Sequence, residues 1–279
     1  MRLREEVFEQ KAFADHIGSD YILVSLDFPD GEEAKAKVPD AKRNEELQAK
    51  YGVQAYPTVL LMTAQGEVFG QTGYTGASPE DYLKNVLALR QEGKIALGKV
   101  KVILKAFEKA EDKLIVTRQA IELLMEMKDS VVARPLAGIL RDGFAWDPKD
   151  QHGLKIPSLM ALLQSDNAGA AELEMAAAED AANEHGLLEY VVAGTMNQLE
   201  NEEQLSGFLT EAEALHKTGI VHDTELVGFL WVNSAYFCHK FLDRPEEAVR
   251  WAKRAQELGE LDEDYQEILD EILGEEDPA

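Results

Sequence analysis

The segment from Tyr51 to Leu61 constrains the fold more than any other part of the chain. A polar helical segment should end at Tyr51, because Gly52 can adopt the left-handed conformation that commonly closes a helix. Pro57 follows after a short connection and stands directly before the apolar run 58–62. A proline cannot donate to a sheet ladder, so it belongs at the mouth of a strand, where an X-Pro bond can be held in cis. The segment therefore predicts a helix, a short connection and a strand that begins beside Pro57.

The pattern on both sides of this segment predicts alternating helices and strands. Residues 21–28 form an almost continuous apolar run rich in β-formers, which is typical of a buried strand of a parallel sheet. Asp40 is placed to cap one helix, and Ser78 followed by Pro79 is a strong start for another. The residues 93–98, with a glycine at each end, indicate a linker. The expected elements, in order, are a helix at 1–17 with a break, a strand at 21–28, a helix at 41–51, strands at 58–62 and 68–72, and a helix at 79–90.

The segments 51–53 (Tyr-Gly-Val) and 56–58 (Tyr-Pro-Thr) together resemble the G-V-x-x-x-P-T signature of the thioredoxin superfamily. In that family the proline is cis, lies beside a redox cysteine pair and lines the groove where substrates dock. The resemblance therefore implies an α/β thioredoxin-like domain in the first third of the chain. It also implies that Tyr56, Pro57 and Thr58 are cis-proline and substrate-groove residues.

A minimal thioredoxin fold also has an opening strand in the middle of its sheet, and the sequence shows no segment for it before the first expected helix. Three arrangements are open: the flanking strands pair directly, another segment substitutes, or the natural protein is longer than this chain. A bacterial branch of the superfamily supports the third. Leu3, Val7 and Phe8 match the spacing that follows its W-C-x-x-C motif, if the second cysteine stood immediately before Met1. Residues 99–104 alternate like a replacement strand, but a helix start is favoured there.

From about residue 95 onward, apolar positions recur every three or four residues, which predicts helices only. Short polar breaks separate these helices and indicate an antiparallel helical array. The last pair but one resembles a tetratricopeptide (TPR) unit, with Ala235 and Tyr236 in its first helix and Pro245 at the start of its second. We therefore expect an N-terminally incomplete α/β thioredoxin-like domain at residues 1–94 and an acidic all-helical domain, TPR-like in this unit, at residues 95–279.

The net charge of −25 bounds the partners that the chain can bind. No Lys or Arg occurs between Lys155 and Lys217, and such an acidic surface repels phosphate backbones, so no nucleic acid is expected as a partner. No apolar run approaches the ~18 residues of a membrane span, so no membrane is expected either. The N-terminus shows no apolar signal core, which indicates a cytoplasmic protein unless an exported segment precedes it. We expect a protein partner or a substrate protein, with basic character favoured, although the charge can also serve solubility alone.

Few residues suit catalysis. Cys238 is the single cysteine, so the chain cannot supply a vicinal thiol pair, and its apolar helical surroundings indicate a buried, inert side chain. The stripe of Trp231, Ala235 and Cys238, together with Trp251, indicates a helix–helix core. No phosphate-binding or dinucleotide-binding glycine motif is found, and no cofactor is expected. The histidines considered as metal ligands, none with a full ligand set, are His152, His216 and His222.

Two functional hypotheses follow. In the first, the natural gene product is a thiol–disulfide oxidoreductase whose cysteine pair lies upstream of Met1, as the family resemblance implies. In the second, the chain is a redox-inactive binding module whose helical array is the partner surface. The presence of a single thiol favours the second hypothesis for the polypeptide as given, and no enzymatic activity is expected of this polypeptide.

Overall fold

The computed structural model of the chain describes residues 2–29, 31–53, 55–197, 199, 201–259 and 261–274. Contacts group the chain into two compact units. The N-terminal unit runs to Val102 and takes in Ser130–Ala133, while the C-terminal unit holds Ile103–Asp129 and the chain from Arg134 onward. The division into domains at residues 94 and 95 stays a prediction, and a single helix runs through that point.

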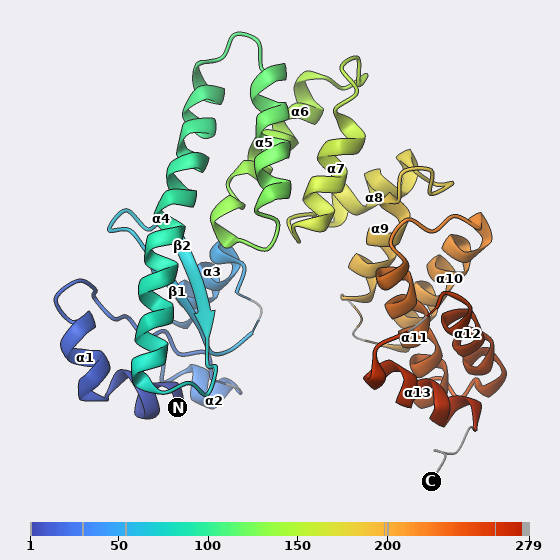
Figure 1. Cartoon of the computed structure of the whole chain (residues 1–279), viewed down its shortest axis with the longest axis horizontal. Helices are drawn as coiled ribbons and strands as arrows, with labels where there is room; N and C mark the ends of the chain where they lie inside the picture. The colour runs from blue at the N-terminus through green and yellow to red at the C-terminus, as the bar shows by residue number, and fades with distance from the viewer. Residues whose placement is uncertain are drawn as a thin grey trace. The chain divides into compact units, whose positions relative to one another are not determined.

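The described part of the N-terminal unit contains a two-stranded antiparallel sheet with helices around it (Figure 1). Strand β1 pairs with β2 so that Leu60 lies opposite Gln71, and the register shifts between Leu61 and Met62. The elements are the π-helix η1 (Arg4–Phe8), α1 (Lys11–Ile17), α2 (Glu32–Lys35), α3 (Ala41–Tyr51), β1 (Thr58–Met62), β2 (Val68–Gly73) and α4 (Pro79–Lys109).

Several predicted elements of this unit are confirmed. Helix α3 begins where the Asp40 side chain accepts a hydrogen bond of 3.0 Å from the backbone N–H of Arg43. It ends at Gly52, whose φ of 59° gives the expected left-handed cap. The β1–β2 hairpin and the start of α4 at Pro79 also lie where the sequence predicts them.

The core of the N-terminal unit is built around the first turns of α4. Tyr82 is 1% exposed, and its ring meets the rings of Phe8 and Phe13 edge-on, with centroids 6.0 and 5.9 Å away. Such edge-to-face pairs add to the free energy gained from burying the rings. The two N-terminal helical segments are thereby held against α4.

The prediction that residues 21–28 form a strand of the sheet is wrong. These residues form no strand and pair with no strand of the described chain. The side chains of Ile22, Leu23 and Val24, expected to be buried, are 92%, 57% and 74% exposed. The apolar β-forming sequence specifies an extended backbone, but a strand also needs a neighbour that accepts and donates its ladder hydrogen bonds.

The linker predicted at residues 93–98 is also wrong, because α4 passes through both of its glycines as one helix of 31 residues. A Cβ atom at Gly93 would lie 1.5 Å from the backbone oxygen of Phe69, so this glycine lets α4 approach β2 closely. Glycine weakens a helix interior by only about 1 kcal/mol relative to alanine, which packing readily offsets. Even with this length, neither α4 nor any other described helix is apolar enough to cross a membrane.

The C-terminal unit is helical throughout its described residues, as predicted (Figure 1). Helix α11 packs along α12, where the rings of Trp231 and Trp251 lie 4.9 Å apart and Ala235 and Cys238 are fully buried, so the predicted helix–helix core is confirmed. The helices that follow α4 are α5 (Leu114–Glu126), α6 (Leu136–Trp146), α7 (Lys155–Gln164), α8 (Ala170–Glu179), α9 (Leu187–Met196), α10 (Glu202–Thr218), α11 (Thr224–Lys240), α12 (Pro245–Glu257) and α13 (Glu263–Leu273). A short 3-10 segment, η2 (Val131–Ala133), belongs to the N-terminal unit.

Candidate functional site

The candidate site is the turn that leads into β1. The peptide bond between Tyr56 and Pro57 is cis. The Tyr56 side chain is 54% exposed, and its ring stacks on that of Phe28 with centroids 5.1 Å apart and an angle of 26° between the rings. The hydroxyl of Thr58 donates a hydrogen bond of 2.6 Å to the carbonyl of Ala55. The turn therefore presents an aromatic ring that is fixed on one face and open to solvent.

Helix α3 holds both chain segments that form this site. The backbone N–H of Val53 donates to the carbonyl of Gln48 over 3.0 Å, and the Gln48 side chain donates back to the carbonyl of Val53 over 3.2 Å. On the same helix, the Asn44 side chain is 6% exposed and donates to the backbone carbonyl of Asp27, next to Phe28, over 3.1 Å. The amide side chains of Asn44 and Gln48, both on α3, therefore hold in place the two chain segments that carry Phe28 and Tyr56.

The chemistry of the turn suits binding better than catalysis. The hydroxyl of Thr58 donates its hydrogen bond to the carbonyl of Ala55, and a carbonyl is not a base that could activate this hydroxyl as a nucleophile. A half-exposed tyrosine held by stacking offers a large contact surface at small cost in conformational entropy. The arrangement can hold a segment of another polypeptide.

The single thiol lies elsewhere. Cys238 is fully buried in α11, in the C-terminal unit. Burial, together with the nearby carboxylate of Glu247, raises the pKa of its thiol to about 11. The thiolate is the reactive form of cysteine, so burial and the raised pKa both disfavour reaction at neutral pH. The burial that the helical surroundings of Cys238 predicted is confirmed.

The comparison with protein-family models finds one match, a thioredoxin-like domain, over residues 1–90. The first 90 residues form a thioredoxin-like domain. The comparison with curated proteins found no match, and neither did the comparison with solved structures. The family match supports the predicted fold of the first third of the chain. The assignment of Tyr56, Pro57 and Thr58 as substrate-groove residues stays a prediction.

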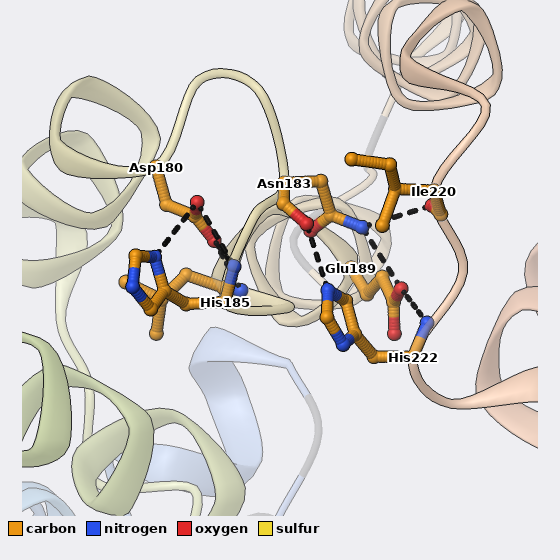
Figure 2. A network of polar contacts seen from close by, with 7 residues as sticks. Asp180, Asn183, His185, Glu189, Ile220 and His222 are labelled. Carbon is orange, nitrogen blue, oxygen red and sulfur yellow. Dashed lines mark hydrogen bonds and ion pairs between the residues drawn. The ribbon is translucent and has the colours of Figure 1, made fainter.

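Outside the thioredoxin-like domain, Glu189 is a hydrogen-bonded carboxylate that is fully buried at the start of α9 (Figure 2). Its Oε1 atom accepts hydrogen bonds from the side-chain amide of Asn183 over 2.9 Å and from the backbone N–H of His222 over 2.7 Å. Its Oε2 atom accepts from the N–H of Asp223 over 2.9 Å. The carboxylate therefore ties the turn before α9 to the turn before α11.

The same two turns are joined by further contacts. The Nε2–H of His222 donates to the carbonyl of Asn183 over 2.8 Å, and the Asn183 amide also donates to the carbonyl of Ile220 over 3.1 Å. Asp180, which is 3% exposed, accepts from the backbone N–H groups of His185 and Leu187 (Figure 2). These hydrogen bonds join the turn before α9 to the turn before α11, so the network acts as a structural joint. Sequence reasoning missed it, although one acidic residue in the apolar run Leu-Leu-Glu-Tyr-Val-Val was a signal.

The remaining histidines have structural contacts. The Nδ1 atom of His152 lies 2.9 Å from a carboxylate oxygen of Asp147, which is 9% exposed. Burial opposes the ionised form of Asp147, yet hydrogen bonds from Gln151 and His152 outweigh burial and hold its carboxyl pKa below the ordinary value. His216 lies edge-on to the ring of Trp231, 6.0 Å away. Within the described residues, no three acidic, histidine or cysteine side chains are grouped to hold a metal ion.

Proposed function

We propose that the thioredoxin-like domain binds an extended segment of a protein partner at Tyr56, Pro57 and Thr58, and that it does so without redox chemistry of its own. The observation that carries the proposal is the exposed Tyr56 ring, held in place by its stack on Phe28. Rigid, half-exposed aromatic side chains are enriched among the residues that dominate binding energies at protein interfaces. The family resemblance independently assigns this turn to the groove where partner polypeptides dock.

Thiol–disulfide exchange needs a thiolate within reach of the partner, and the polypeptide offers only Cys238. That thiol is buried and has a raised pKa, so it supports no exchange in the folded state. Binding at Tyr56 therefore describes the capacity of this polypeptide better than oxidoreductase activity does.

In this proposal the helical unit contributes a second partner surface. The α11–α12 pair supports the interpretation of this unit as TPR-like. Helix α12 begins with Pro245, and its small residues Ala248, Ala252 and Ala255 are buried. The absence of Lys and Arg between Lys155 and Lys217 favours a basic partner for this unit. The two units together act as an adaptor that engages a protein partner.

The proposal is tested with peptides selected on the protein. A displayed library of random heptapeptides is selected on the full chain, and the enriched peptides are measured by fluorescence anisotropy. Tyr56→Ala should weaken binding about tenfold, since loss of an interface aromatic costs on the order of 1.4 kcal/mol or more. Leu87→Ala is the control, because Leu87 is 45% exposed but lies on α4. Equal binding by the wild type and Tyr56→Ala would contradict the proposal.

A further inference from the structure

The end of α11 carries a cluster of three aromatic side chains at the surface of the C-terminal unit, formed by Tyr236, Phe237 and Phe241. Phe241 is 58% exposed, and the other two are partly buried. The Phe241 ring lies edge-on to that of Tyr236, with centroids 5.9 Å apart, and its centroid is 6.1 Å from that of Phe237. Large apolar side chains that gather at a surface mark a place where another molecule binds.

The aromatic cluster is held in place from the interior of the unit. The Phe237 ring lies edge-on to that of Phe208, which is fully buried on α10, with centroids 5.9 Å apart. The backbone N–H groups of Phe241 and Leu242 both donate to the carbonyl of Phe237, over 3.1 and 3.2 Å. Rings and a backbone that are already ordered lose little conformational entropy when a partner binds.

The charged groups that follow the aromatic cluster leave an excess of negative charge beside it. The two basic side chains of this stretch are each paired with a carboxylate, in the ion pairs Lys240–Glu271 and Arg244–Glu247. Asp243 and Glu246 are exposed, and neither takes part in an ion pair of the described chain. The cations are thus neutralised and two carboxylates are not, so this surface attracts a positively charged partner.

We propose that the aromatic cluster binds a short segment of a partner protein in which large apolar side chains stand beside arginine or lysine. The apolar side chains pack against the three rings, since buried aromatic residues dominate binding energies at interfaces. A guanidinium or ammonium group of the partner is attracted by the face of the Phe241 ring and by the carboxylates of Asp243 and Glu246. The proposal rests on the second partner surface proposed above, to which it assigns particular residues and a partner chemistry, and it makes no use of Tyr56.

The test uses the full chain and defined peptides, measured by fluorescence anisotropy. The probe is a fluorescein-labelled heptapeptide in which leucine and arginine alternate. One control peptide has glutamate in place of arginine, and the other has serine in place of leucine. Because the proposal requires both the charge and the apolar side chains, the probe should bind at least about tenfold more tightly than either control peptide.

Substitutions in the chain separate the contribution of the rings from that of the charges. Phe241→Ala should weaken binding of the probe at least about tenfold, whereas Phe241→Tyr keeps the ring and should weaken it no more than about threefold. Asp243→Asn combined with Glu246→Gln should weaken binding about fivefold at low ionic strength. This loss should nearly disappear in about 0.3 M sodium chloride, because salt screens exposed charges.

Three results would overturn the proposal. Equal affinity of the wild type and Phe241→Ala for the probe, with unchanged circular dichroism spectra, would show that the aromatic cluster is not used. An equal loss of affinity in Ile115→Ala, which removes a side chain that is 63% exposed on α5, would show that the probe adsorbs to any apolar surface of this unit. Light scattering that shows a dimer of the wild type and a monomer of Phe241→Ala would assign the aromatic cluster to a second copy of the chain.

The same probe distinguishes this proposal from binding at the thioredoxin-like domain. Tyr56→Ala should leave the affinity for the probe within about twofold of the wild type, because the aromatic cluster lies in the other unit. A loss in Tyr56→Ala without a loss in Phe241→Ala would place the probe at the turn before β1, which overturns the present proposal and leaves the function proposed for that turn intact.

Discussion

At the scale of single residues, the buried carboxylate of Glu189 is the most consequential side chain of the C-terminal unit. It accepts hydrogen bonds from Asn183, His222 and Asp223 and has no exposed surface. A buried charge is stable only while its partners remain in place, and three donors depend on this one carboxylate. Glu189 therefore contributes to the joint between the two turns beside the hydrogen bonds from His222 to Asn183 and from Asn183 to Ile220.

Glu189→Ala should lower the free energy of unfolding by about 1–3 kcal/mol, because it removes the acceptor of three hydrogen bonds, one of them from the buried Asn183 amide. Urea denaturation followed by tryptophan fluorescence is the appropriate measurement. The three tryptophans, Trp146, Trp231 and Trp251, all lie in the C-terminal unit. Glu174→Ala, at an exposed position on α8, is the control and should change stability by no more than about 0.5 kcal/mol. A Glu189→Ala protein as stable as this control would show that the network contributes nothing.

At the scale of elements, Gly93 and Gly98 show what a sequence pattern predicts and where it fails. Two glycines in a polar stretch indicate a linker, yet both lie inside α4. The sequence cannot distinguish a glycine that permits flexibility from one that permits close packing, because the difference lies in a residue distant along the chain. Here that residue is Phe69 on β2.

The two glycines should respond to alanine in opposite directions. Gly93→Ala places a Cβ atom against the Phe69 backbone and should destabilise the protein by about 1–3 kcal/mol. Gly98→Ala meets no atom within 4 Å and should stabilise it by about 0.5–1 kcal/mol, because alanine favours the helix. Thermal melting followed by circular dichroism at 222 nm compares both variants with the wild type. A linker at this place would make both substitutions nearly neutral.

The apolar segment at residues 22–26 shows a different limit of prediction. Its composition predicts a buried strand, which the structure does not have there, whereas the Gly-Val and Pro-Thr pattern correctly predicts a thioredoxin-like domain. Pairing is a property of two segments, so one apolar run cannot reveal whether a neighbour is present. The candidate site at Tyr56 also depends on more than one segment. The sequence motif singles out Tyr56, but the stack of its ring on Phe28 depends on the contacts by which α3 holds both segments.

At the scale of the whole molecule, the sequence predicts the helical character of the second part but not the joint within it. Periodicity is local and predicts the helices from α5 onward. The pairing of Glu189 with His222 joins residues 33 positions apart and exists only once α9 and α11 have packed. The net charge, by contrast, is fixed by composition alone, so its effect on the stability of the folded chain can be predicted without knowing which residues are in contact.

A net charge of −25 should make the folded chain sensitive to ionic strength. Excess like charge destabilises a compact state through self-repulsion, and salt screens exposed charges over about 10 Å at 0.1 M. Screening also weakens exposed ion pairs such as Lys101–Glu67 and Lys240–Glu271, but exposed pairs contribute little to stability. Repulsion should outweigh this loss, so the melting temperature should rise by a few degrees between 10 and 200 mM sodium chloride (about 30 Å and 7 Å of screening length). Calorimetry at pH 7 provides the measurement, with equal sucrose osmolality as the control. A melting temperature that falls with salt would mean that favourable ion pairs, rather than the net charge, dominate the electrostatics of this protein.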